Sequence, residues 1–219
     1  MERWATFDCY GTLVDWRAGI RGELARLFGD DSADGLLSRY YELEPDVQRD
    51  GALAYRNVLA RTLARVATEF DLVVPAGEED ALAWSLAGWP VFPEVRESLA
   101  ETRVRGWRLG ILSNTDRDLM ESSVAALHVP FDLTVVASEI GSYKPARRHW
   151  DVFADQTGVP PDRHVHVAQS LFHDIGATNA LGLRSIWINR LGERAGLTPT
   201  RELPDLTRLA DTLDELVPE

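Results

Sequence analysis

The chain has 219 residues, and its 35 Asp and Glu residues outnumber its 23 Lys and Arg residues, which gives a formal net charge of −12. This charge argues against a protein that binds the phosphate backbone of nucleic acid or an anionic membrane surface, but it leaves an anionic small-molecule substrate open. A single cysteine permits no internal disulfide, no apolar run reaches the ~20 residues that span a bilayer, and the first residues form no signal peptide, so we expect a cytoplasmic enzyme.

Five short apolar segments have the composition of buried strands. They cover residues 4–7, 108–112, 133–137, 164–168 and 185–188. The last four are spaced by roughly 20–30 residues, which is typical of repeated βα units. Strands that are apolar on both faces are buried on both faces, which favours a parallel sheet. Helical patterns are predicted between and after these strands, over 117–127, 146–157, 171–180 and 206–217, with Gly158 and Gly182 as helix ends.

The interval between the first two strands has a different character. Its apolar residues recur at helical spacing, for example at Leu36, Leu37 and Tyr40 and again at Leu59 and Leu63. A crossover between parallel strands needs only about a dozen residues, and this interval is several times longer. We therefore expect an α/β core made of residues 1–15 and 91–219, with an inserted helical domain at 16–90.

Polar residues follow four of the predicted strands. Asp8 follows the first strand, Ser113 and Asn114 end the second, Lys144 comes after the third, and Asp174 comes after the fourth. Ligands of open parallel sheets bind outside the carboxyl ends of the strands. We therefore expect two carboxylates, an ammonium and a hydroxyl to converge on one crevice. His164 and His166 share one face of the fourth strand and are interpreted as core or surface positions, because their spacing matches no metal site.

These segments resemble the four motifs of the haloacid dehalogenase (HAD) superfamily, and within it the L-2-haloacid dehalogenase branch. In order, they are Asp8-Cys9-Tyr10-Gly11-Thr12, Ser113-Asn114, Lys144-Pro145 and the stretch that ends at Asp174. The resemblance covers nearly the whole chain. It implies a Rossmann-like parallel-sheet HAD core with an inserted α-helical cap, and a homodimer as in many members of that branch.

The chemistry of two positions favours the dehalogenase branch over the phosphatases. The resemblance implies that a phosphatase has a second Asp two residues after the nucleophile, where this chain has Tyr10, and tyrosine has an ordinary pKa of about 10. An acidic position of the fourth motif is occupied by the neutral Gln169. We therefore expect no metal and no cofactor. A Mg²⁺-dependent phosphatase that acts on a small phosphate ester is the alternative, because Asp8 and Asp174 could together hold the ion.

A carbon–halogen bond needs neither a metal nor an acid, because halide is a weak base. The expected reaction is attack of Asp8 on C2 of a small 2-haloalkanoic acid, which gives an aspartyl ester and then the 2-hydroxy acid. Lys144 would keep Asp8 ionised and Asp174 would orient or deprotonate the hydrolytic water. The expected substrate-binding residues are Tyr10, Thr12, Arg39, Ser113, Asn114, Gln169 and Ser170.

One of these assignments follows from its position in the cap, and three other positions depart from the pattern of the branch. Arg39, followed by Glu42-Leu43-Glu44, falls where the resemblance implies a cap arginine that contacts the substrate. Gln169, Leu171 and Trp150 differ from the Ser, Asn and Tyr that are typical of the branch, so a related hydrolase of a non-halogenated small carboxylic acid is a further alternative. A binding protein with a decayed site is disfavoured, because the acidic and basic residues of all four motifs are present.

Overall fold

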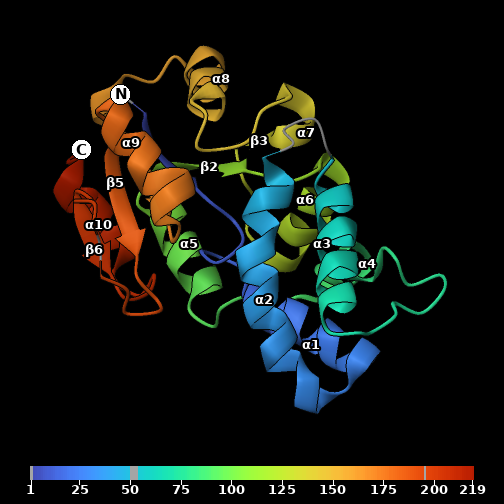
Figure 1. Cartoon of the computed structure of the whole chain (residues 1–219). Helices are drawn as coiled ribbons and strands as arrows, with labels where there is room; N and C mark the ends of the chain where they lie inside the picture. Colours follow the sequence, from blue (N-terminus) through green and yellow to red (C-terminus); the bar gives the residue numbers. More distant parts are fainter. Residues whose placement is uncertain (1, 50–53, 195) are drawn as a thin grey trace.

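The core of the protein is a six-stranded parallel sheet. The computed structural model describes residues 2–49, 54–194 and 196–219 (Figure 1). The strands are β1 (Arg3–Phe7), β2 (Trp107–Ser113), β3 (Leu133–Val136), β4 (His164–Ala168), β5 (Arg184–Ile188) and β6 (Arg201–Leu203), in the spatial order β3-β2-β1-β4-β5-β6. The five predicted strands are confirmed within one residue at each end. β6 was not predicted, because its three residues have no apolar pattern.

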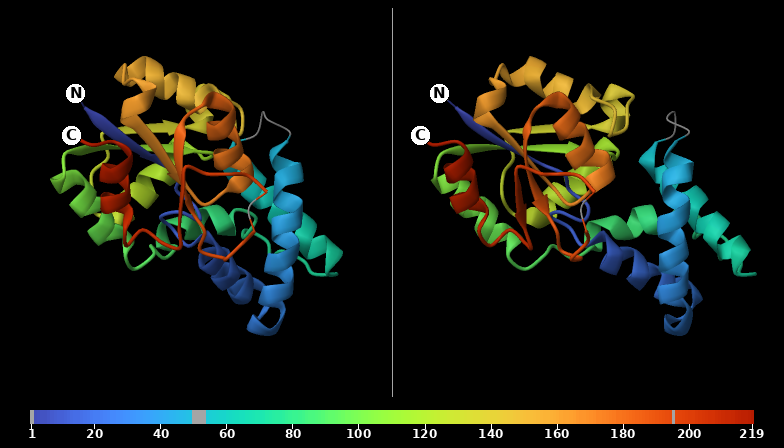
Figure 2. Two further views of the ribbon diagram at one scale, coloured as in Figure 1. Left: turned by 90° about the vertical axis from the view of Figure 1, so that its left-hand side faces the viewer. Right: turned by 60° about the vertical axis from the view of Figure 1, so that its left-hand side comes forward.

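Helices cover both faces of the sheet, as Figure 2 shows from two sides. One face packs against α5 (Val95–Val104), α6 (Arg117–Leu127) and α10 (Leu209–Leu216), and the other against α8 (Arg148–Thr157) and α9 (Gly176–Leu181). Shorter elements are α7 (Ala137–Ile140), η2 (Pro161–Arg163) and the π-helical turn η3 (Leu171–Ile175). Because side chains alternate along a strand, Trp4 joins the cluster around α8, whereas Ala5 and Phe7 join the larger core on the opposite face. This arrangement confirms the predicted α/β class with a parallel sheet.

The four predicted helices of the core are present, but α8 and α10 begin two and three residues later than predicted. The helix at Arg117–Leu127 has the predicted ends, and Gly158 and Gly182 end α8 and α9 in the left-handed conformation with φ of 63° and 67°. The predicted helix at 171–180 is divided into η3 and α9. α5 was not among the predicted helices.

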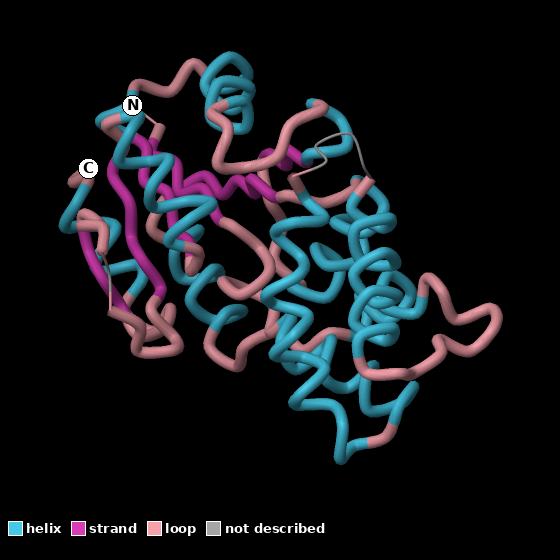
Figure 3. Tube along the Cα trace, in the orientation of Figure 1, coloured by secondary structure: helices cyan, strands magenta, loops and turns pink. Residues whose placement is uncertain are grey.

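The long interval between β1 and β2 folds as the predicted group of helices, drawn in Figure 3 as helices and loops. They are α1 (Trp16–Phe28), α2 (Asp30–Gln48), α3 (Tyr55–Glu69), α4 (Ala81–Ser85) and the 3₁₀ turn η1 (Leu86–Gly88). Leu36, Tyr40, Leu59 and Leu63 are fully buried between them. We call this group the cap. Among the described residues, none of the helices combines the length and apolar character that crossing a bilayer requires.

The cap is joined to the core by two connections that run side by side. The Asp15 N–H donates to the Pro90 carbonyl at 2.7 Å, and the Phe92 N–H donates to the Leu13 carbonyl at 3.1 Å. Val14 and Val91 form an antiparallel bridge between these bonds. The exact domain boundaries at 15/16 and 90/91 stay a prediction. The paired connections hold the cap over the carboxyl ends of the strands.

Candidate active site

Three charged side chains meet at the carboxyl ends of the strands. The Lys144 ammonium donates to Asp8 Oδ1 at 2.9 Å and to Asp174 Oδ1 at 2.6 Å, and its third hydrogen bond goes to the Leu112 carbonyl at 2.8 Å. Asp8 directly follows β1, Lys144 lies in the loop after α7, and Asp174 lies in η3 after β4. All three residues are buried. The structure therefore brings together the three residues that the motifs single out.

The charges of this trio determine one another. Burial alone would lower the pKa of Lys144, but the carboxylates of Asp174 and Asp8 outweigh burial and raise that pKa above its usual value. Burial alone would raise the pKa of Asp174, but Lys144 and His166 outweigh it and hold the pKa well below its usual range. The ammonium and the Asp174 carboxylate are thus both charged near neutral pH.

Asp8 is held on its other oxygen by Thr12. The Thr12 hydroxyl donates to Asp8 Oδ2 at 2.9 Å and accepts the Gln169 N–H at 2.9 Å. Gly11, between Asp8 and Thr12, has φ of +96°, and a Cβ there would lie 3.0 Å from the Trp16 indole nitrogen. The tight turn after β1 therefore needs glycine. Thr12 is fully buried and does not line the cavity. It therefore positions the Asp8 carboxylate, and this placement does not support the contact with a substrate that was predicted for it.

A buried chain of hydrogen bonds supports Asp174 from behind. His166 Nε2 donates to Asp174 Oδ1 at 2.9 Å, and Thr6 Oγ1 lies 2.8 Å from His166 Nδ1 and 2.7 Å from His164 Nε2. The contact of His166 with Asp174 was not predicted from the sequence. The available signal was the alternation on β4, which turns both histidines toward Thr6 on the neighbouring strand β1, where Thr6 and His166 are paired in register.

The two residues of the second motif have separate roles. The Asn114 amide donates to the Lys144 carbonyl at 3.0 Å, and its oxygen accepts the Lys144 N–H at 2.6 Å, so this side chain holds the loop that carries Lys144. The Ser113 hydroxyl is buried at the cavity wall, and among the described residues it has no hydrogen-bond partner. Ser113 is therefore the free donor of the pair.

The trio opens onto a cavity of about 220 Å³ between core and cap. Tyr10 forms one wall: its ring stacks on Tyr55 with centroids 6.3 Å apart, and its hydroxyl lies 3.0 Å from Ser123 Oγ. Burial raises the pKa of Tyr10 far above its usual value, so this residue gives no acid near neutral pH. Gln169 and Ser170 also line the cavity. Ser170 Oγ accepts a hydrogen bond from the backbone N–H of His173 at 3.0 Å.

The structure does not bring Arg39 to this cavity. Its side chain is 36% exposed and pairs with Glu69 of α3 and Glu42 of its own helix. Successive residues of an α-helix point about 100° apart, so Tyr41 faces the cavity while Arg39 faces solvent. Arg39 therefore does not line the cavity, and this placement gives no support to its predicted contact with the substrate.

The cap contributes residues that sequence analysis did not assign to the site. They are Trp16 from α1, Tyr41, Glu44, Pro45 and Gln48 from α2, and Tyr55 from α3. The Tyr55 hydroxyl donates to Glu44 Oε1 at 3.0 Å. A signal was present in the sequence, because Glu44 lies beside Leu43 and Val47 within the apolar stripe of α2, where a carboxylate is unusual.

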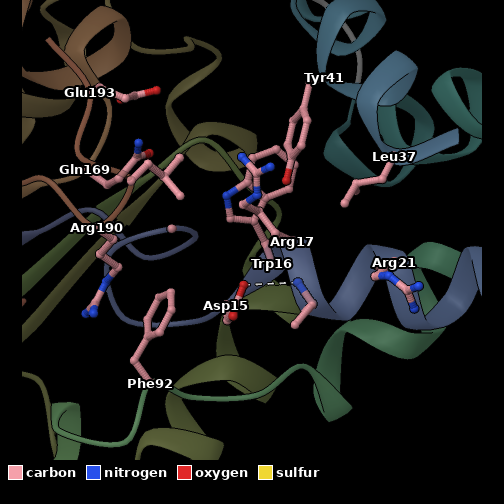
Figure 4. Close-up of a pocket in the computed structure, with 13 residues that line it drawn as sticks. Asp15, Trp16, Arg17, Arg21, Leu37, Tyr41, Phe92, Gln169, Arg190 and Glu193 are labelled. Atoms are coloured by element: carbon pink, nitrogen blue, oxygen red, sulfur yellow. Dashed lines mark hydrogen bonds between the residues drawn. The ribbon is translucent and has the colours of Figure 1, made fainter. Parts of the chain in front are cut away.

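A second, larger cavity of about 710 Å³ lies beside the first, between α1 and α2 of the cap and loops of the core (Figure 4). Trp16, Tyr41 and Gln169 line both cavities. The rings of Trp16 and Tyr41 meet edge to face with centroids 4.6 Å apart, and the Arg17 guanidinium lies 4.4 Å from the centre of the Tyr41 ring. We call these the inner and the outer cavity, and the chemical groups of the trio face the inner one.

The donor set of the inner cavity does not fit a divalent metal well. Asp8 Oδ1 and Asp174 Oδ1 share the Lys144 ammonium, and Asp8 Oδ2 accepts from Thr12. Of these four carboxylate oxygens, only Asp174 Oδ2 has no partner among the described residues. One free carboxylate oxygen beside an ammonium is a weak site for Mg²⁺, which takes six hard oxygen ligands. The described part of the chain contains no group of three or more His, Cys, Asp or Glu side chains placed to hold a metal.

Comparisons with known proteins agree with this geometry. A family model described as haloacid dehalogenase-like hydrolase matches residues 3–182. The "(S)-2-haloacid dehalogenase 4A" of Burkholderia cepacia is 25% identical over 99% of this chain and 94% of its own length, and the "Phosphoserine phosphatase" of Thermus thermophilus is 30% identical over 60% and 52%. The crystal structure of the L-2-haloacid dehalogenase RSc1362 superposes with a TM-score of 0.87 and 25% identity, covering 97% of this chain and 99% of that one. The chain belongs to the haloacid dehalogenase-like hydrolase family.

Proposed function

We propose that this hydrolase displaces halide from C2 of a small 2-haloalkanoic acid through an ester on Asp8. The observation that carries the proposal is the Asp8 carboxylate, which Lys144 and Thr12 hold in one direction, together with Tyr10 at the position where a phosphatase would have its acid. The similarity of the Burkholderia cepacia dehalogenase over nearly the full length of both chains supports it.

In the first step, a carboxylate oxygen of Asp8 attacks C2 from the side opposite the halogen. The new C–O bond forms as the C–X bond breaks, and the bonding electron pair leaves with the halide. Lys144 and Thr12 fix the direction of the carboxylate, which brings the reacting atoms into line. The configuration at C2 is inverted.

In the second step, water attacks the carboxyl carbon of Asp8. The tetrahedral intermediate carries a negative charge on oxygen, which the buried Lys144 ammonium stabilises. The unpartnered Asp174 Oδ2 accepts a hydrogen bond from the water and orients it. Its low pKa makes Asp174 a weak base, so orientation is its main task and deprotonation is secondary. As the ester bond to Asp8 breaks, one proton of the attacking water passes to the alkoxide oxygen of the departing 2-hydroxy acid and the other passes to solvent, and the Asp8 carboxylate is restored.

The substrate carboxylate is assigned to the free hydroxyl of Ser113 and to backbone N–H groups at the strand ends. The cavity of about 220 Å³ is roughly seven times the ~30 Å³ that one water occupies in the liquid, which suits an acid of few carbon atoms. A homodimer and a cytoplasmic location stay predictions.

The test combines isotope labelling with a substitution. Under single turnover in H₂¹⁸O, the label is expected in Asp8 and not in the first molecule of 2-hydroxy acid, and Asp8→Asn is expected to abolish halide release from 2-chloropropionate while the folded state persists. We expect EDTA to leave turnover unchanged.

A phosphatase is the second candidate, because the Thermus thermophilus relative carries that name. Mg²⁺-dependent release of phosphate from a generic phosphate ester, with no halide release, would favour it over the proposed reaction.

A further inference from the structure

We infer that Glu44 of the cap acts as a neutral carboxylic acid that donates a hydrogen bond to the departing group. Such a donor favours leaving groups that accept strong hydrogen bonds, fluoride above all. This inference rests on the proposed attack of Asp8 at C2 and assigns a role to a residue on the opposite wall of the same cavity. It also narrows the substrate class, to small carboxylic acids whose leaving group at C2 is a poor one.

The direction of the displacement places the leaving group against the cap. Asp8 attacks from the core side of the inner cavity, and an in-line displacement sends the departing atom to the opposite side. The opposite side is formed by α2 and α3, where Glu44 lines the cavity and is only 9% exposed. Glu44 is the one carboxyl group that the described part of the cap contributes to this cavity.

The surroundings of Glu44 keep its proton in place. No Lys or Arg from the described residues pairs with it, whereas the exposed Glu42 on the same helix pairs with Arg39. Burial raises the pKa of Glu44 to about 7, although hydrogen bonds from Tyr55 and Gln48 act in the opposite direction. A carboxyl kept neutral by an apolar site is a hydrogen-bond donor at neutral pH.

Other titratable groups near Glu44 are tyrosines on its own and adjacent segments and the charged and polar groups that line the cavity. They are Tyr40, Tyr41, Tyr55, Tyr10, Tyr143, Asp8, Lys144, Asp174 and His173. Lys144 is shared by two carboxylates, so it leaves no surplus positive charge to ionise Glu44.

The step balances without a further reactant. As the bond from Asp8 to C2 forms and the C–F bond breaks, the electron pair goes to fluoride, and the Glu44 O–H donates to the fluoride ion while keeping its proton. Fluoride is a far stronger hydrogen-bond acceptor than bromide, so this donor stabilises the transition state of defluorination more than that of debromination. When Glu44 ionises, it loses the donor and repels the departing anion.

The experiment compares 2-fluoropropionate with 2-bromopropionate in two substitutions of Glu44. Glu44→Leu removes the donor. We expect kcat/KM for 2-fluoropropionate to fall by about 30-fold or more, whereas kcat/KM for 2-bromopropionate stays within about 3-fold of the value for the unsubstituted protein. Glu44→Gln keeps an N–H donor, so defluorination is retained within about 5-fold. Glu42→Gln, on the exposed face of the same helix, is the control and is expected to leave both substrates unchanged.

A pH profile separates this role from a merely structural one. For the unsubstituted protein, kcat/KM for the fluoride falls as pH rises above about 7, because Glu44 loses its proton. Glu44→Gln removes this limb. Tyr55→Phe removes a hydrogen bond that favours the ionised form and moves the limb to higher pH, on the order of one pH unit.

Three outcomes would overturn the inference. An equal loss of both substrates in Glu44→Leu would indicate a packing role. Loss of fluoride selectivity in Tyr41→Phe, with no change in the Glu44 variants, would assign the donor to the Tyr41 hydroxyl, which is also buried without a partner among the described residues. Absence of halide release from either substrate in the unsubstituted protein would overturn the proposed function as well, which distinguishes that failure from the other two.

Discussion

Asp174 and His166 are joined by a hydrogen bond of 2.9 Å inside the protein, so the carboxylate that faces Lys144 is held from behind. His166 is itself held by Thr6 at 2.8 Å. The position of Asp174 therefore depends on a strand residue that does not line the cavity.

Replacing His166 by Leu should slow ester hydrolysis more than ester formation. Without the hydrogen bond, Asp174 no longer places the water, and we expect kcat to fall by about 10-fold while the ester on Asp8 accumulates. Mass spectrometry of the quenched enzyme measures the ester. His166→Gln keeps a donor and should lose less activity. An equal slowing of both steps would contradict the assigned role.

Replacing Lys144 by Met should destabilise the protein by about 3–5 kcal/mol at pH 7, because two buried carboxylates are left without their cation. Without Lys144, burial is expected to raise the folded pKa of Asp174 above that of the unfolded chain. The folded state then binds more protons, so the loss becomes smaller as pH falls toward 4. Urea denaturation at pH 7 and pH 5 measures this.

The matched control is Arg147→Met, since Arg147 is exposed and pairs with the nearby Asp151. Its effect on the free energy of unfolding should be small and the same at either pH, because solvent screens an exposed ion pair. A loss in Lys144→Met that does not depend on pH would contradict the account of the trio.

Two buried histidines should make the protein sensitive to mild acid. Burial lowers the pKa of His164 to about 3 and that of His149 to about 4. Because the unfolded chain takes up these protons near pH 6.5, the free energy of unfolding should fall between pH 6.5 and 4 by about 1.4 kcal/mol per pH unit for each histidine. Urea denaturation across this range measures the slope. His164→Leu should reduce it, and the exposed His128→Asn should not.

Replacing Arg39 by Gln should leave kcat/KM within about 2-fold, because its ion pairs lie on the surface of the cap. Replacing Ser113 by Ala should raise KM by about 10-fold, since it removes the free buried hydroxyl assigned to the substrate carboxylate. Steady-state kinetics with 2-chloropropionate compares the two variants. A large loss of kcat/KM in Arg39→Gln, with little change in Ser113→Ala, would support the contact between Arg39 and the substrate that the resemblance implies.

Replacing Tyr41 by Ala should widen the range of substrates. This side chain lines both cavities, and its removal opens the inner cavity toward the outer one (Figure 4). We expect the ratio of kcat/KM for a six-carbon to a three-carbon 2-haloacid to rise by about 10-fold. Tyr40→Phe, inside the cap, serves as the control. An unchanged ratio would indicate that the cavities stay separate.

Much of the fold was predictable from the sequence, because its signals are local. Apolar strands, glycine helix ends and the long helical interval all depend on neighbouring residues, and each is confirmed. The meeting of Asp8, Lys144 and Asp174 was also predictable, because the carboxyl ends of parallel strands meet along one edge of the sheet.

Tertiary structure alone decided which side chains of the cap face these three residues. Arg39 and Glu44 lie on the same helix, and the sequence favoured the arginine, but the packing of α2 against α3 and the core turns Glu44 inward and leaves Arg39 paired at the surface. The same applies to His166, whose contact with Asp174 spans two elements. Helix rotation and contacts between elements depend on the packing of the whole molecule, so local sequence patterns do not determine them.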